Sequence, residues 1–179
     1  LVVSEDTKEA DASKLMRLNN FFHLPVVDDW GRLVGLHVAE QLHSAKKRTE
    51  TLVIMAGGRG QRMMPLTANT PKPMLPLQGR PILQHIIERA KDDGFERIVI
   101  SVNYLSEVIM SYCGNGSQFG VEISYLIENQ PLGTAGALAQ IPKTLRNSNL
   151  VITNADLVTG LAYSDLVLYA EQERTEGLM

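Results

Sequence analysis

The pattern of hydrophobic and polar positions changes character at Thr51. From there, short apolar runs typical of buried parallel strands alternate with segments whose apolar residues recur at helical spacing. In the clearest helical segment, residues 82–93, the apolar stripe ends at Gly94, and glycine commonly follows the last turn of a helix. The expected strands are 51–56, 97–103, 121–128 and 150–156, and the expected helices are 82–93, 105–113, 136–141 and 164–174.

This alternation predicts an α/β fold with a mostly parallel sheet and helices on both faces. The connections between its strands are expected to be right-handed. Ligands of such sheets bind beyond the carboxyl ends of the strands. Four features of the sequence fall at those ends: the glycine- and arginine-rich loop after residue 56, Asn103, the segment 128–136 and Asp156.

The first 50 residues have a different pattern. Residues 10–20 show helical spacing, and residues 22–28 and 33–38 are predicted as two short strands of a hairpin around the turn "DWGR". Polar and charged residues then dominate up to Glu50. We therefore expect a small α+β unit at 1–45, a linker at 46–50 and the main domain at 51–179.

Composition and charge narrow the class of protein. The chain has 44% hydrophobic and 21% charged residues, which excludes a disordered chain, and its net charge of −3 argues against a dedicated nucleic-acid binder. Its single cysteine, Cys113, excludes an intrachain disulfide framework and favours a reducing, cytoplasmic location. Apolar runs are too short for a membrane span, which needs about 20 residues. The four histidines have no metal-ligand spacing.

The loop after the first apolar strand, "MAGGRGQRMMPLTANTPKP", carries the clearest chemical signal. It lacks the Gly-Lys-Ser/Thr ending of a Walker A loop, and Met63 stands where a dinucleotide fingerprint needs its third glycine. Glycines instead allow backbone N–H groups to approach phosphate oxygens, and Arg62 matches phosphate geometry. Lys72 lies between two prolines, which stiffen its segment. Binding of a phosphorylated ligand explains this combination of glycines, prolines and positive charge better than a plain surface loop does.

The same loop resembles the signature of the sugar-1-phosphate nucleotidyltransferases, A-G-G-x-G-x-R, P-L-T, P-K-P and G-[KR]-P-[IM]. Two later segments also resemble that family in order and spacing: "QPLGTAGAL" (130–138) is similar to its nucleotide-base segment, and "ITNADLV" (152–158) to its N-G-D metal motif, with Ala155 where glycine is usual. The positions that match the loop signature are Ala56, Gly57, Gly58, Gly60, Arg62, Pro65, Leu66, Thr67, Pro71, Lys72, Pro73, Gly79, Pro81 and Ile82.

The resemblance implies a Rossmann-like nucleotide-diphospho-sugar transferase fold and a defined reaction. A sugar 1-phosphate would attack the α-phosphorus of a nucleoside triphosphate, giving a nucleotide sugar and pyrophosphate. By this resemblance Arg62 and Lys72 are the catalytic residues, and Mg²⁺ binds Asp156. The residues alone leave Asp156 open between a metal ligand and a helix N-cap. The implied nucleotide-binding residues are Ala56, Gly57, Gly58, Gly60, Asn103, Gln130, Gly133 and Gly136.

The front piece, residues 15–42, resembles the second half of a cystathionine-β-synthase-type (CBS) regulatory motif. Val38 and Gln41 stand where such motifs carry their ribose-contacting Thr and Asp, so a structural or dimerising role competes with adenosine binding, and a homo-oligomer is one expected assembly. In having a CBS piece before the domain, the chain is similar to the guanylyltransferase-like members of the family. This similarity favours GTP as the nucleoside triphosphate, with a sugar 1-phosphate as the second substrate.

Two other functions stay open: a regulatory module that binds nucleotide without turnover, and a nucleotidyltransferase acting on a non-sugar phosphate. Only 23 residues follow Asp156. In the family a second metal-binding Asp and the sugar-binding half lie further along, so we expect the catalytic domain to be truncated and this chain alone to be weakly active or inactive.

Overall fold

The computed structural model describes residues 1–39, 47–128, 136–143, 145, 148–173 and 177, and it divides into two compact units. The first unit spans Leu1–Lys46 and the second Lys47–Met179. Each unit has its own hydrophobic core.

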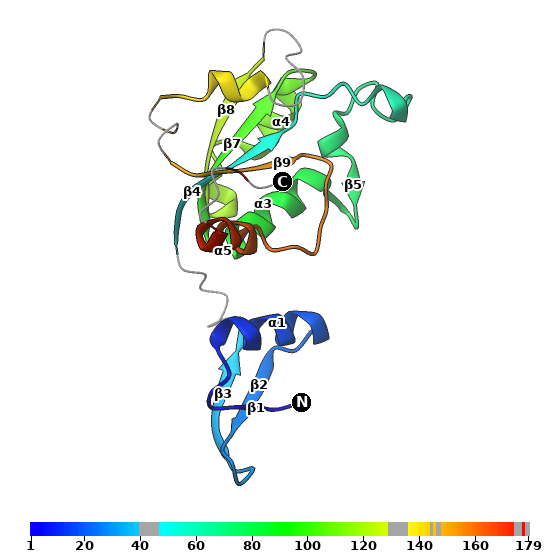
Figure 1. The fold of residues 1–179 in the computed structure, drawn as a ribbon. Coiled ribbons are helices and arrows are strands. Elements are labelled where there is room, and N and C mark those ends of the chain that lie inside the picture. Colours follow the sequence, from blue (N-terminus) through cyan, green and yellow to red (C-terminus); the bar gives the residue numbers. More distant parts are fainter. Residues whose placement is uncertain (40–46, 129–135, 144, 146–147, 174–176, 178–179) are drawn as a thin grey trace. The chain divides into compact units, whose positions relative to one another are not determined.

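The first unit is a three-stranded sheet covered by one helix (Figure 1). Strands β2 (His23–Val27) and β3 (Leu33–Val38) form the predicted antiparallel hairpin. Helix α1 (Glu9–Asn19) packs Ala12 and Met16 into its core. The sequence did not predict β1 (Val3–Ser4), which pairs in parallel with β2 and is only two residues long.

The second unit is built on a four-stranded parallel sheet with the order β8-β7-β4-β9. This order confirms the predicted parallel α/β fold, and it places the first strand, β4, between β7 and β9, as in doubly wound nucleotide-binding sheets. The strands are β4 (Arg48–Met55), β7 (Phe95–Val102), β8 (Glu122–Ile127) and β9 (Leu150–Asn154).

Both faces of this sheet are covered. Alternate residues of β4 face opposite sides: Leu52 and Ile54 belong to one core cluster and Val53 to another, and all three are fully buried. Three α-helices pack on the first face, and the 3-10 helix η4 (Gly136–Gln140) contributes Leu138 to the second. The α-helices are α3 (Ile82–Asp92), α4 (Ser106–Cys113) and α5 (Tyr163–Glu173).

Two boundaries differ from the predicted ones. Strand β4 begins at Arg48, inside the expected linker 46–50, because the Arg48 N–H donates to the Gly94 carbonyl at 2.9 Å and extends the pairing with β7. The expected α-helix at 136–141 is the five-residue 3-10 helix η4, which ends at Gln140.

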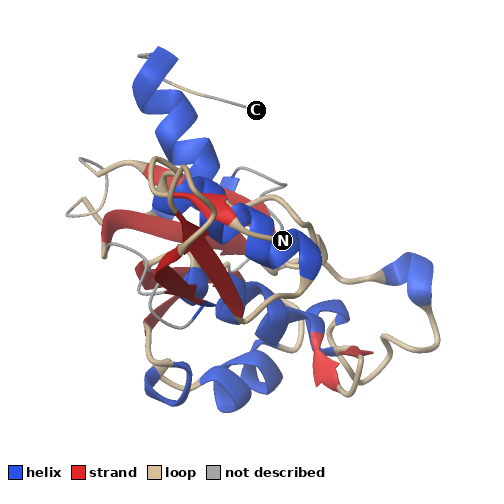
Figure 2. Cartoon of the chain, turned by 90° about the horizontal axis from the view of Figure 1, so that it is seen from below, coloured by secondary structure: helices blue, strands red, loops and turns tan. Residues whose placement is uncertain are grey.

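The segment between β4 and α3 extends from one side of the second unit (Figures 1 and 2). It contains the short 3-10 helices η1 (Gln61–Met63) and η2 (Lys72–Met74), and the small hairpin of β5 (Pro76–Leu77) and β6 (Arg80–Pro81). A further 3-10 helix, η3 (Ser117–Phe119), precedes β8. In the described part of the chain, no helix combines the length and apolar character that crossing a bilayer requires.

Candidate active site

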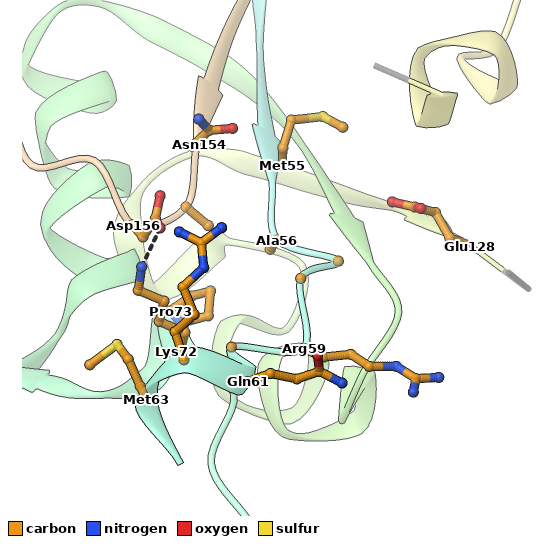
Figure 3. Close-up of a pocket in the computed structure, with 15 residues that line it drawn as sticks. Met55, Ala56, Arg59, Gln61, Met63, Lys72, Pro73, Glu128, Asn154 and Asp156 are labelled. Carbon is orange, nitrogen blue, oxygen red and sulfur yellow. Dashed lines mark hydrogen bonds and ion pairs between the residues drawn. The ribbon is translucent and has the colours of Figure 1, made fainter. Parts of the chain in front are cut away.

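The carboxyl ends of the parallel strands open into a cavity of about 740 Å³ (Figure 3). It is lined by residues 55–63, from the end of β4 through the glycine loop, by Lys72 and Pro73, by Glu128 after β8, and by residues 154–156 at the end of β9. The sheet therefore brings the predicted loop and Asp156 together, although they are about 100 positions apart in the sequence.

The residues of the glycine loop line this cavity. Ala56 still belongs to the sheet, because its N–H donates to the Ser101 carbonyl at 2.8 Å. The next five N–H groups, those of residues 57–61, donate to no acceptor in the described part of the chain. Backbone N–H groups are obligatory donors, so a run of them beside a cavity is suited to an anion such as phosphate.

Glu128 lies directly against this loop. A Cβ atom built on Gly57 would lie 2.8 Å from Glu128 Oε1, so only glycine fits at position 57 without displacing that carboxylate. Glu128 is buried, and its Oε1 accepts a hydrogen bond from the Ser101 hydroxyl. Asn103 donates its side-chain amide to the Glu128 carbonyl at 2.5 Å. Asn103 thus fixes the backbone of Glu128 and does not itself line the cavity, and its expected contact with a nucleotide stays a prediction.

Two charged residues that line the cavity, Glu128 and Arg59, were not among the predicted site residues. Glu128 follows a predicted strand, as Asn103 and Asp156 do, so the rule that selected those two residues also pointed to Glu128. Arg59 lies inside the glycine signature, and its side chain extends away from Lys72 and Asp156 (Figure 3).

Lys72 and Asp156 form an ion pair inside the cavity, and Figure 3 shows their side chains pointing toward one another. Both side chains are partly exposed, at 33% and 40%. Lys72 is the first residue of η2, between Pro71 and the buried Pro73. Arg62 also lines the cavity, and the described residues include no ion-pair partner for it. The cavity therefore contains Arg62, which has no carboxylate partner in the part of the chain that the structure describes, and Lys72, whose partner is Asp156.

The position of Asp156 excludes one of its two sequence interpretations, the helix N-cap. Helix α5 begins at Tyr163, seven residues later, so Asp156 does not cap it. Within the described residues no cluster of three or more His, Cys, Asp or Glu side chains forms a complete metal site. Mg²⁺ is commonly held by one or two carboxylates together with substrate phosphates. The single carboxylate of Asp156, in a cavity where it already pairs with a cation, fits that mode of binding.

Two of the three residues expected in the nucleotide-base segment, Gln130 and Gly133, lie outside the described residues. The third, Gly136, begins η4. It does not line the described cavity, so its role in binding a base stays a prediction.

The fold and this cavity define a nucleotide-binding α/β domain with a phosphate-binding glycine loop. Residues 51–179 match the family described as Nucleotidyl transferase (NTP_transferase). The chain therefore belongs to the nucleotidyl transferase family, as its motifs predicted.

Curated relatives of the chain act on different sugars. The chain is 36% identical over 124 residues to mannose-1-phosphate guanylyltransferase of Mycobacterium tuberculosis, covering 69% of this chain and 34% of that protein. It is 39% identical over 115 residues to N-acetylmuramate alpha-1-phosphate uridylyltransferase of Neisseria meningitidis, covering 63% and 49%. The chain spans between a quarter and a half of the length of the curated relatives it matches.

A solved structure shares the fold. HddC from Yersinia pseudotuberculosis, crystallised with GMP-PN, superimposes with a TM-score of 0.61 at 30% identity, covering 68% of this chain and 54% of that one. The Rossmann-like fold of the nucleotide-diphospho-sugar transferases is thus confirmed for the second unit.

Proposed function

We propose that this chain belongs to an enzyme that transfers a nucleoside monophosphate group from a nucleoside triphosphate to a sugar 1-phosphate. One observation carries this proposal: residues 57–61, whose backbone N–H groups have no acceptor among the described residues, line the same cavity as Arg62, Lys72 and Asp156. This set of donors and cations suits a reaction between two anions.

The proposed mechanism relies on positioning and charge neutralisation. The attacking sugar phosphate is already ionised, so the reaction needs no general base. The glycine loop, with Gly57, Gly58 and Gly60, holds the triphosphate through backbone N–H groups, while Arg62 and Lys72 offset the charge that builds up during transfer. Mg²⁺, when bound, would further neutralise the phosphates. Asp156, whose Oδ2 pairs with Lys72, is the residue that would hold it.

Several finer assignments belong to the same proposal. GTP is the favoured triphosphate, supported by relatives that include the guanylyltransferase of M. tuberculosis and by HddC, crystallised with GMP-PN. The buried carboxylate of Glu128 also lines the cavity, and a carboxylate can accept hydrogen bonds from both N–H groups on the Watson–Crick edge of guanine. Asn103, Gln130, Gly133 and Gly136 complete the proposed nucleotide site.

The first unit is proposed as a partial CBS motif with a structural or dimerising role. Its support is the small α+β unit that the structure separates from the catalytic unit. A cytoplasmic location agrees with the single buried cysteine and with the nature of the proposed substrates.

The reaction is tested by pyrophosphate release. The protein is incubated with Mg²⁺, each of the four common ribonucleoside triphosphates and a panel of sugar 1-phosphates, with mannose 1-phosphate and GTP as the expected best pair. Binding of GTP without pyrophosphate release from any pair would favour the alternative of a non-catalytic nucleotide-binding module.

Arg62→Ala tests the site in the same assay. We expect roughly a 10²- to 10³-fold loss of rate, the range typical of losing one transition-state donor. Arg80→Ala is the matched control, because Arg80 pairs with Glu88 at 2.7 Å and does not line the cavity. Equal rates for the Arg62 variant and the control would remove Arg62 from the mechanism.

A further inference from the structure

Thr67 is a fully buried polar residue in the segment that follows the glycine loop. Its hydroxyl donates to the Gly60 carbonyl oxygen at 2.9 Å, and the Met63 N–H donates to the same oxygen at 2.9 Å. Gly60 has left-handed backbone angles, φ 61° and ψ 23°. A Cβ atom at that position would lie 3.0 Å from Thr67 Cγ2 and 3.4 Å from Lys72 Cβ. Gly60 is therefore enclosed between Thr67 and the base of the Lys72 side chain.

The hydrogen bond from Thr67 fixes the orientation of one peptide group in the loop. In a trans peptide the carbonyl and the following N–H point in opposite directions. The Gly60 carbonyl points to Thr67, which does not line the cavity, so the Gln61 N–H is directed away from Thr67. That N–H is one of the five without an acceptor in the described residues, and both Gly60 and Gln61 line the cavity.

The Thr67 segment is in turn attached to the sheet. The Tyr104 hydroxyl, just beyond the carboxyl end of β7, donates to the Ala68 carbonyl at 2.8 Å. A chain of two hydrogen bonds thus runs from the sheet edge through Tyr104 and Thr67 to the glycine loop. Neither Tyr104 nor Thr67 lines the cavity.

We propose that Thr67 is a positioning residue for triphosphate binding. This proposal rests on the proposed function. Its hydroxyl holds the Gly60 carbonyl away from the cavity, so that the loop N–H groups remain oriented for phosphate oxygens without rearrangement on binding. A carbonyl oxygen that rotated toward the cavity would repel a phosphate and would replace a donor by an acceptor.

The test compares Thr67→Val, which removes the hydroxyl at nearly constant shape, with Thr67→Ser, which keeps it. Dissociation constants are measured for GTP, pyrophosphate and guanosine. The Val variant is expected to bind GTP and pyrophosphate roughly three- to tenfold more weakly, the range of one neutral hydrogen bond, and guanosine unchanged, because guanosine carries no phosphate. The Ser variant is expected to bind all three like the wild type.

Tyr104→Phe provides a second measurement that does not depend on the buried Val variant folding. It removes only the hydroxyl that anchors Ala68, so it should weaken GTP binding more than guanosine binding. If Thr67 contributed only to stability, Thr67→Val would lower the melting temperature and leave the ratio of GTP to guanosine affinity unchanged.

Two results would overturn the inference while leaving the proposed function intact: unchanged GTP affinity in a folded Val variant, or a Ser variant as weak as Val. If the Val variant does not fold, equal losses for GTP and guanosine in Tyr104→Phe would overturn it as well. A wild-type chain that binds neither GTP nor pyrophosphate would instead contradict the proposed function, and the inference would fall with it.

Discussion

At the scale of single residues, the ion pair between Lys72 and Asp156 matters most for ligand binding. In the proposed reaction Lys72 is needed by a phosphate and Asp156 by Mg²⁺, so their mutual contact competes with both partners. A triphosphate that arrives with Mg²⁺ supplies a new partner to each residue at once. A triphosphate that arrives without the metal has to break the ion pair before it can bind Lys72, and the Asp156 carboxylate, left without a cation, then repels it.

Asp156→Asn is therefore expected to have opposite effects in two conditions. With a chelator present, the variant should bind GTP several-fold more tightly than the wild type, because Lys72 is released and a negative charge is lost. With Mg²⁺ present, it should bind GTP more weakly, because the metal loses its protein ligand. Isothermal titration in both buffers measures the two affinities.

Glu96→Gln is the control for these opposite effects on GTP affinity. It also removes a carboxylate from an ion pair, but Glu96 pairs with Lys47 at 2.6 Å outside the cavity. It should leave GTP binding unchanged in both buffers. Asp156→Asn weakening GTP binding equally with and without Mg²⁺ would contradict the exchange of partners.

The sequence predicted seven of the fifteen residues that line the cavity, because these seven lie in contiguous motifs. It missed Glu128, since an acidic residue after an apolar strand is usually solvated, and only the neighbouring Gly57 shows that the carboxylate is enclosed. Its placement of Asn103 beside the nucleotide stays a prediction, and the structure adds that the Asn103 amide donates to the Glu128 carbonyl. These partnerships join β7, β8 and the glycine loop, and local sequence patterns carry no information on such contacts.

At the scale of elements, the glycine loop contains two neighbouring glycines with different constraints. Gly57 faces Glu128, and a Cβ there would lie 2.8 Å from a carboxylate oxygen and 3.3 Å from Cδ. A Cβ on Gly58 would meet nothing within 4 Å. A side chain at position 57 would therefore have to displace the buried Glu128 carboxylate, whereas at position 58 only a ligand could require glycine.

Gly57→Ala should destabilise the fold by roughly 1–3 kcal/mol, the usual cost of overpacking a buried site. Gly58→Ala should leave the free energy of unfolding within about 0.5 kcal/mol of the wild type, the usual range away from packed sites. Urea denaturation measures both values. Weaker GTP binding by a fully stable Gly58 variant would show that phosphate approaches the backbone at that residue, whereas equal stability of the two variants would contradict the enclosure of Gly57.

The elements themselves were predicted well where apolar periodicity is strong, as in α3 and β7. The segment 136–141 was predicted as an α-helix, yet residues Gly136–Gln140 form the 3-10 helix η4. Its Ala137 is buried, and Leu138 and Ile141 pack on the second face of the sheet, so tertiary contacts favour a shorter, tighter turn there. The start of β4 was missed because Arg48 and Thr49 are polar and pair through their backbone.

At the scale of the whole molecule, Cys113 makes stability depend on pH. It is fully buried in the core between the sheet and its helices, and burial raises the pKa of its thiol from 9.0 to about 12. Between these values the unfolded chain loses the thiol proton while the folded chain keeps it. The folded state is then progressively disfavoured, so this contribution to stability is complete below pH 9 and is lost as pH rises toward 12.

Cys113→Ala removes this contribution. The free energy of unfolding of the wild type should fall more steeply between pH 9 and 11 than that of the variant, by roughly 1.4 kcal/mol per pH unit at most. Urea titrations of both proteins across this range measure the difference. Tyr125 contributes to it as well, because its pKa is raised to about 12 first by burial and then by the charge of the nearby Cys113 thiolate, which the variant lacks. Parallel pH profiles would show that the buried thiol does not carry the effect.

The two units of the molecule have separate cores, and every residue that lines the cavity belongs to the second unit. The chain 47–179 is therefore expected to fold alone and to bind GTP like the whole chain. The shorter chain 51–179, cut at the boundary that the sequence pattern predicted, should be less stable. It lacks Arg48, which donates to the Gly94 and Asp93 carbonyls at 2.9 and 3.1 Å, and the Thr49 carbonyl, which accepts from Arg97.

Each lost hydrogen bond contributes roughly 0.5–1.5 kcal/mol, and Arg48 also stacks its guanidinium 5.9 Å from the centre of the Phe95 ring. We expect the chain 51–179 to unfold with roughly 1–3 kcal/mol less free energy than 47–179. Urea denaturation and GTP titration of the two fragments and of the whole chain test this together. Equal stability of the fragments would make residues 47–50 the linker that their composition suggested, and loss of GTP binding in 47–179 would show that the nucleotide site depends on the first unit.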